Sequence, residues 1–92
     1  MGKKDKAKEV FAKVFELPQE VVLNLPRISL TGNLQIEIEN HRGIIKYNSD
    51  FIKVRVYHGQ IIIKGEKLII ESLEKDILRI EGKITDLSFK LS

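Results

Sequence analysis

The sequence contains no cysteine, only two prolines, and no apolar run longer than three residues. Without cysteine the chain can form neither a disulfide framework nor a thiolate metal site, a composition compatible with the cytosol. A membrane-spanning helix needs roughly 20 consecutive apolar residues. A secretory signal needs an uninterrupted apolar stretch, whereas lysines are scattered through residues 1–17. We therefore expect neither a membrane span nor a secretory signal.

Signatures of catalytic and phosphate-binding sites are also absent. The sequence has no G-x-S-x-G motif, and its six glycines form neither a P-loop nor a G-x-G-x-x-G motif. The two histidines, His41 and His58, can supply at most half of a zinc site. Glu74 and Asp76 lie in a predicted solvated turn, which offers no pocket for acid–base chemistry. The sequence therefore predicts no catalytic residue, no cofactor and no metal site.

The net charge of +3 is concentrated near the N-terminus. Residues 1–17 contain five lysines and three acidic residues, whereas the remaining 75 residues contain 11 basic and 10 acidic ones. Nucleic-acid binding is not expected, because the tyrosines and phenylalanines do not interleave with a basic patch.

The apolar residues of the basic segment are spaced for one face of a helix. Steps of three, one, three and one separate Ala7, Val10, Phe11, Val14 and Phe15. This spacing predicts an amphipathic helix over residues 1–17 with a lysine-rich opposite face. Proline at position 18 ends it, and residues 18–27 form a Pro-bounded linker or helical turn.

Two roles are open for this helix. Its apolar stripe can cover a hydrophobic sheet face while the lysines contact water. Alternatively, Val10, Phe11, Val14 and Phe15 contact a partner's groove, or the helix docks on anionic lipid, to which each basic residue contributes about 1 kcal/mol.

Residues 28–92 have the two-residue period of β-strands. Apolar residues alternate with polar ones at Leu34, Ile36 and Ile38, at Ile52, Val54 and Val56, and at Leu78 and Ile80. Small residues recur at intervals of 17, 16 and 17, at Gly32, Ser49, Gly65 and Gly82. Each 16–17-residue unit therefore reads as two short strands joined by a small-residue turn or kink, with reversals at 40–43, 58–59 and 74–76.

Two mainly β architectures fit this repeat. One is an antiparallel β-meander curled into a roll or sandwich, and the other is a short β-solenoid with one unit per coil. Apolar alternation on both sides of Tyr57-His58-Gly59-Gln60 is typical of a tight hairpin, which favours the meander. Open strand edges would permit self-association or pairing with another protein.

The segment Glu39-Asn40-His41-Arg42-Gly43 combines charge, imidazole and glycine in one predicted reversal. Its histidine and His58 are one repeat unit apart, so both could lie at the same end of the domain. Histidine is tolerated in turns, and the structural interpretation is favoured. If the segment has a further role, we expect Asn40, His41 and Arg42, with His58, to form a surface that a protein partner contacts.

The order of motifs resembles the YqfC branch of the YabP/YqfC family of sporulation proteins from endospore-forming Firmicutes. The resemblance rests on these blocks: Glu16-Leu17-Pro18, Asn24-Leu25-Pro26-Arg27-Ile28, Gly32, Ile38 to Ile44, Gly65 to Leu68, Ile80 to Ile84, and Leu87 with Phe89. It covers nearly the whole chain, although residues 1–8 match only in being basic.

This resemblance implies a small non-enzymatic protein of the mother-cell cytoplasm, acting in spore-envelope assembly, cortex or coat, at the outer forespore membrane. It implies no cofactor and no catalytic residue, and as partner a neighbouring YqfD-like sporulation membrane protein. Two alternatives stay open from the residues: a homo-oligomeric β scaffold, and a small enzyme or ligand-binding domain around His41, Arg42 and His58.

Overall fold

The computed structural model describes residues 24–91, and within them all regular structure is β-strand. The strands are β1 (Arg27–Thr31), β2 (Gln35–Glu39), β3 (Ile44–Tyr47), β4 (Phe51–Val56), β5 (Gly59–Leu73) and β6 (Ile77–Leu91). The mainly β class is therefore confirmed. The helix predicted over residues 1–17 lies outside the described residues.

All neighbouring strands are antiparallel, and together they form one six-stranded sheet in the order β1-β2-β6-β5-β4-β3. The predicted meander is present in β3 to β6, where each strand pairs with the next. The β1–β2 hairpin departs from it, because β2 pairs with β6 instead of β3. The solenoid alternative is wrong, since stacked coils would require parallel pairing.

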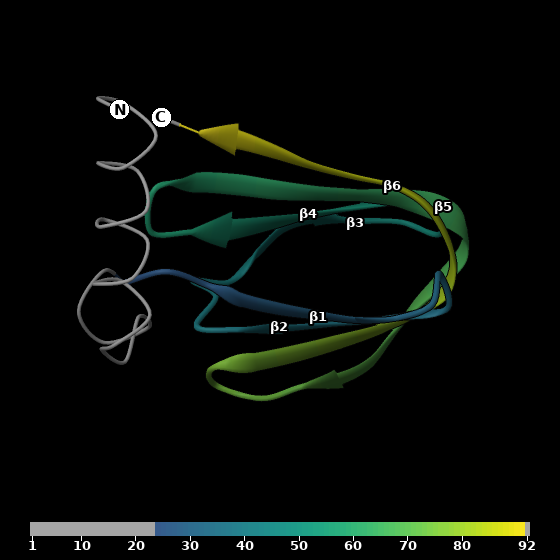
Figure 1. The fold of residues 1–92 in the computed structure, drawn as a ribbon, viewed down its shortest axis with the longest axis horizontal. Helices are drawn as coiled ribbons and strands as arrows, with labels where there is room; N and C mark the ends of the chain where they lie inside the picture. The colour runs from purple at the N-terminus through teal and green to yellow at the C-terminus, as the bar shows by residue number, and fades with distance from the viewer. Residues whose placement is uncertain (1–23, 92) are drawn as a thin grey trace, which may run out of the picture.

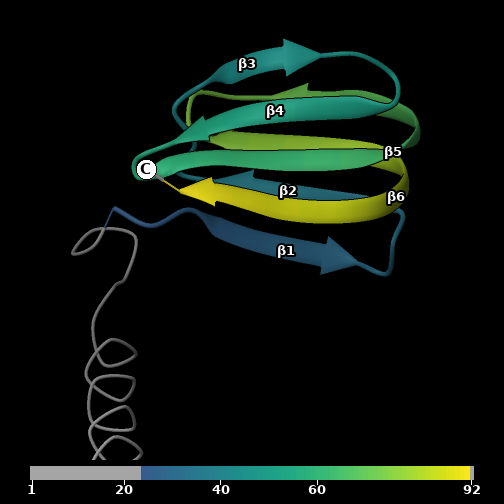
Figure 2. The same ribbon diagram turned by 90° about the horizontal axis from the view of Figure 1, so that it is seen from above.

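The long β5–β6 hairpin bends in its middle and folds the sheet into two facing layers (Figure 1). One layer contains β3, β4, the first half of β5 and the second half of β6. The other contains β1, β2, the first half of β6 and the second half of β5 (Figure 2). Both long strands therefore contribute to both layers.

Glycines allow the close backbone approach at this bend. A Cβ atom on Gly65 would collide with the carbonyl oxygen of Lys83. Gly82 has a φ of 142°, and a Cβ there would lie 2.7 Å from the carbonyl oxygen of Lys67. The pairing register also shifts between Lys64 and Gly65, as expected where an extra residue increases the local bend.

The sequence repeat corresponds to two hairpins and two bent strands. Gly32 and Ser49 lie in the β1–β2 and β3–β4 turns, at the same end of the molecule as the bend (Figure 1). The Gly82 N–H donates to the Leu34 carbonyl at 3.0 Å, and the Gly65 N–H donates to the Asp50 carbonyl at 2.9 Å. Each hairpin turn is thus hydrogen-bonded to one of the two glycine bends.

The hydrophobic core lies between the two layers. It is formed by Ile36, Ile38, Ile52, Val54, Val56, Ile61, Ile63, Leu68, Leu78, Ile80 and Ile84. The period-two alternation predicted this core correctly from Ile36 onward in the first segment. Leu34 is the exception, because it lies in the β1–β2 turn with 63% of its surface exposed. Burial of each Ile or Leu contributes about 1.5–3 kcal/mol to folding.

Candidate functional site

Residues 40–43 connect β2 in one layer to β3 in the other. Asn40 has a φ of 64°, a left-handed conformation that asparagine adopts more readily than most residues. Its backbone N–H donates to the Asp76 carbonyl at 2.7 Å, and its side-chain amide donates to the Leu25 carbonyl at 3.0 Å. Asn40 therefore holds the segment before β1 and the β5–β6 loop against the connection.

The imidazole of His41 is buried within this connection, with 7% of its surface exposed. Its Nδ1 accepts the Gly43 N–H at 3.0 Å, and its Nε2 lies 3.3 Å from the Glu74 carbonyl oxygen. A carbonyl only accepts, so both contacts are satisfied when the ring proton is on Nε2. The ring thus joins the connection to the β5–β6 loop and presents little surface to a partner.

Arg42 and His58 are exposed and are linked through Tyr57. The Arg42 guanidinium lies 5.6 Å from the Tyr57 ring centroid, and the Tyr57 and His58 rings meet edge to face at 4.4 Å. The structure therefore brings two of the predicted contact residues to one end of the molecule. The other predicted contacts, Val10, Phe11, Val14 and Phe15, lie outside the described residues.

An apolar groove of about 230 Å³ opens at this same end, beside the start of β1. We call it the end groove, and its lining residues are Leu25, Pro26, Ile28, Val56, His58, Phe89 and Leu91. Phe89 and Leu91 belong to the inward face of β6, yet 54% and 72% of their surfaces are exposed. The end groove is therefore a part of the interlayer space that the described residues leave open.

Apart from His58, the sequence prediction did not select the residues of the end groove. Leu87, Phe89 and Leu91 alternate with polar residues in the same way as the strands that were recognised. That alternation indicates an inward-facing strand. It does not indicate that the facing layer ends before it covers Phe89 and Leu91.

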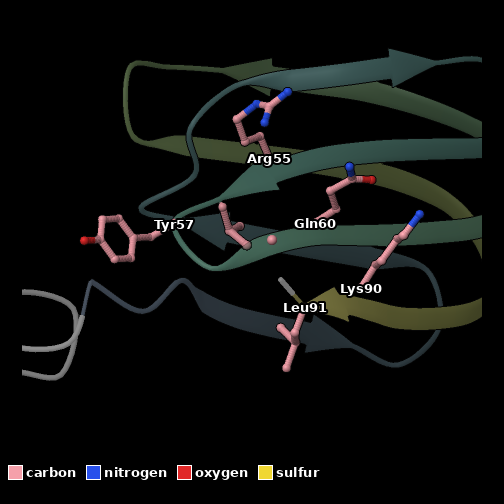
Figure 3. Close-up of a pocket in the computed structure, with 7 residues that line it drawn as sticks. Arg55, Tyr57, Gln60, Lys90 and Leu91 are labelled. Carbon is pink, nitrogen blue, oxygen red and sulfur yellow. The ribbon is translucent and has the colours of Figure 1, made fainter.

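A second hollow, of about 320 Å³, lies on the outer side of β4, β5 and β6. Arg55, Gln60 and Lys90 point to the same side of the sheet there, whereas Leu91 points to the other (Figure 3). Its lining includes neither a carboxylate nor a histidine. Among residues 24–91, no group of three or more His, Asp and Glu side chains could hold a metal ion.

The outer side of the other layer carries four glutamates, Glu37, Glu39, Glu71 and Glu81. Glu37 forms a 2.8 Å ion pair with Arg79, whose pKa is raised by that hydrogen bond and charge. A hydrogen bond that the protonated Glu81 carboxyl donates to Glu71, followed by the charge of Glu71, raises the pKa of Glu81 above its ordinary value. Two carboxylates this close repel each other at neutral pH.

Comparisons with known proteins agree with the family resemblance. Residues 24–92 match the model of the YabP family. The sequence is 33% identical over 82 residues to the protein YqfC of Bacillus subtilis (strain 168), covering 89% of this chain and 88% of that protein. No solved structure matches the chain. No helix long and apolar enough to cross a membrane occurs in the part of the chain that the structure describes.

Proposed function

Because the chain belongs to the YabP family, a family generally associated with sporulation, we propose that it is a non-enzymatic adaptor in spore-envelope assembly. In this proposal the folded sheet is a rigid scaffold in the mother-cell cytoplasm, peripheral to the outer forespore membrane. It binds a neighbouring sporulation membrane protein of the YqfD kind.

The end groove is the observation that carries this proposal. Large apolar side chains exposed together commonly mark a protein-binding site, whereas single exposed apolar residues are ordinary. Phe89 and Leu91 are exposed side by side on one face of β6, with Leu25 and Pro26 across the opening. We infer that apolar side chains of the partner fill this space.

Arg42, Tyr57 and His58 lie at the same end and supply a polar and aromatic rim. Protein interfaces commonly combine an apolar centre with a polar rim, and arginine and tyrosine are enriched in interfaces relative to the rest of the surface. In this proposal the partner contacts Arg42 and His58, two residues of the predicted contact surface, together with the end groove.

Co-purification from sporulating cells tests the proposal. The full chain with Phe89→Asp should lose the membrane protein, because the partner would have to desolvate a carboxylate in an apolar site. Ile69→Asp is the matched control, since Ile69 is similarly exposed, at 59%, and does not line the groove. Retention by the Phe89 variant, or equal loss in both variants, would contradict the role of the end groove.

A second candidate is self-assembly through the strands at the ends of the sheet order. Within residues 24–91, β1 and β3 each pair with only one strand. Their outer backbone groups can pair with another copy, as is common for open edges. Light scattering that gives a monomer mass at high protein concentration would exclude this candidate.

A further inference from the structure

We propose that the outer side of the β3–β4–β5–β6 layer binds the anionic headgroups of a lipid bilayer. This inference deepens the proposed function, because it names the surface that would face the membrane. It rests on a basic face formed by Lys46, Lys53, Arg55, Lys64 and Lys90.

The register places these five cations on one side of the sheet. Arg55, Gln60 and Lys90 are aligned across β4, β5 and β6, and Lys46 is aligned with Lys53 across β3 and β4. Lys64 lies two residue pairs further along β5, so alternation keeps it on the same side. The intervening residues Ile52, Val54, Ile61 and Ile63 are buried in the core, which identifies this side as the outer one.

Most of this charge is unpaired within the described part of the chain. No ion pair among residues 24–91 involves any of the five cations. Among residues 24–91, Asp86 is the one carboxylate aligned with them, opposite Lys64. Adjacent strands are about 4.8 Å apart, so the five cations occupy a strip roughly 15 Å wide. A strip of this density attracts an extended anionic surface.

The hollow between Arg55 and Lys90 gives one position on this face more definite chemistry. Both side chains rise on the same side of the sheet, with the Gln60 amide between them (Figure 3). An arginine, a lysine and an amide donor can together bind the oxygens of one headgroup phosphate. The remaining lysines would then act through charge without fixed geometry.

Two other anionic partners fit less well. Single-stranded nucleic acid is usually bound by exposed aromatic rings between the cations. On this face the ring of Phe51 is instead covered by the ammonium groups of Lys46 and Lys53, at 5.5 and 6.0 Å from its centroid.

The other possible partner is the acidic face of a second copy. This face is the outer side of the layer that contains β1 and β2, and it carries Glu37, Glu39, Glu71 and Glu81. Its carboxylates are partly paired within the same chain, since Glu37 contacts Arg79 at 2.8 Å and Glu39 lies 3.7 Å from Arg27. Such pairing lowers the charge left to attract another molecule. The charge of an anionic bilayer is not neutralised in this way, and the bilayer is wide enough to contact the whole basic face.

Vesicle co-sedimentation of the purified full chain tests this proposal. The protein should bind vesicles of equal parts phosphatidylglycerol and phosphatidylcholine, and not vesicles of phosphatidylcholine alone. Arg55→Gln with Lys90→Gln should weaken binding about 25-fold, because each basic residue near such a surface contributes about fivefold. Higher salt should weaken the binding of the unsubstituted protein.

Two control variants separate the basic face from net charge. Lys75→Gln with Lys83→Gln removes the same charge away from this face and should leave binding within about twofold. Lys6→Gln with Lys8→Gln tests the basic N-terminal segment. Loss of binding only in the N-terminal variant, equal loss in all three, tighter binding to single-stranded DNA, or no binding to anionic vesicles would overturn the proposal. The partner co-purification has an independent outcome, so the two proposals can fail separately.

Discussion

Replacing His41 by alanine should destabilise the fold, because the imidazole links the β2–β3 connection to the β5–β6 loop. The substitution removes the acceptor for the Gly43 N–H and the group that contacts the Glu74 carbonyl. Each lost hydrogen bond costs about 0.5–1.5 kcal/mol, and the vacated buried volume adds a further cost of similar size. We expect the free energy of unfolding to fall by about 2–4 kcal/mol.

Urea denaturation followed by circular dichroism measures this change directly. For a domain of this size the expected loss corresponds to a fall in Tm of roughly 10–25 °C. His58→Ala is the matched control, since the same residue type is exposed there and should cost less than about 1 kcal/mol. A cost below about 1 kcal/mol for His41→Ala, or equal costs for both variants, would refute the assigned role.

The bend and the acidic face give two further predictions. Gly82→Ala should destabilise the protein about 1–3 kcal/mol more than Gly32→Ala. Both glycines have a positive φ, but only a Cβ atom at Gly82 would collide with backbone, at the Lys67 carbonyl oxygen. Equal losses of unfolding free energy in chemical denaturation would contradict this. Glu81→Gln should raise the Tm at pH 7. The pKa of Glu81 is raised beside Glu71, so the favourable contribution of Glu81 to folding is present at low pH and is lost as pH rises through the folded-state pKa. The gain should disappear in melts performed below the ordinary glutamate range, and a gain that does not change with pH would contradict the cause.

Local patterning was sufficient to predict that the chain forms strands with a two-residue period, although it indicated short strands where β5 and β6 are continuous. Ile52, Val54 and Val56 are all buried, as their alternation with charged residues indicated, and the two-residue turn at Tyr57 and His58 lies where the hairpin was predicted. These features depend on residues close in sequence. The pairing of β2 with β6 joins residues some 40 positions apart, and no local pattern specifies which strand will occupy an open edge.

The glycine repeat was visible, but its structural meaning was not. At Gly32 it is a hairpin turn, whereas at Gly65 and Gly82 it is a bend within a continuous strand. A small residue between apolar neighbours is compatible with either outcome. The difference is decided by the contacts of each bend with a turn from another hairpin, as in the hydrogen bond from Gly82 to Leu34.

The same limit applies to the candidate site. The block around His41 was recognised as a reversal, and the structure shows that its polar groups are largely used within the fold. The end groove was not recognised, because it depends on where the layer facing Phe89 stops. Loss of sporulation in a His41→Ala strain would therefore not demonstrate catalysis, since a destabilised scaffold predicts the same phenotype; the denaturation experiment has to be performed first.

Charge provides the clearest example of information that only the fold contains. Residues 18–92 are nearly neutral, which in a linear sequence argues against an anionic partner. Folding separates this charge because β5 and β6 bend between the layers, so that the outer positions before and after the bend face opposite directions. Lys64 and Lys90 then lie outside one layer, and Glu71 and Glu81 outside the other. An electrostatic partner of this protein should therefore be sought with variants chosen by face, since variants chosen by net charge would average the two faces together.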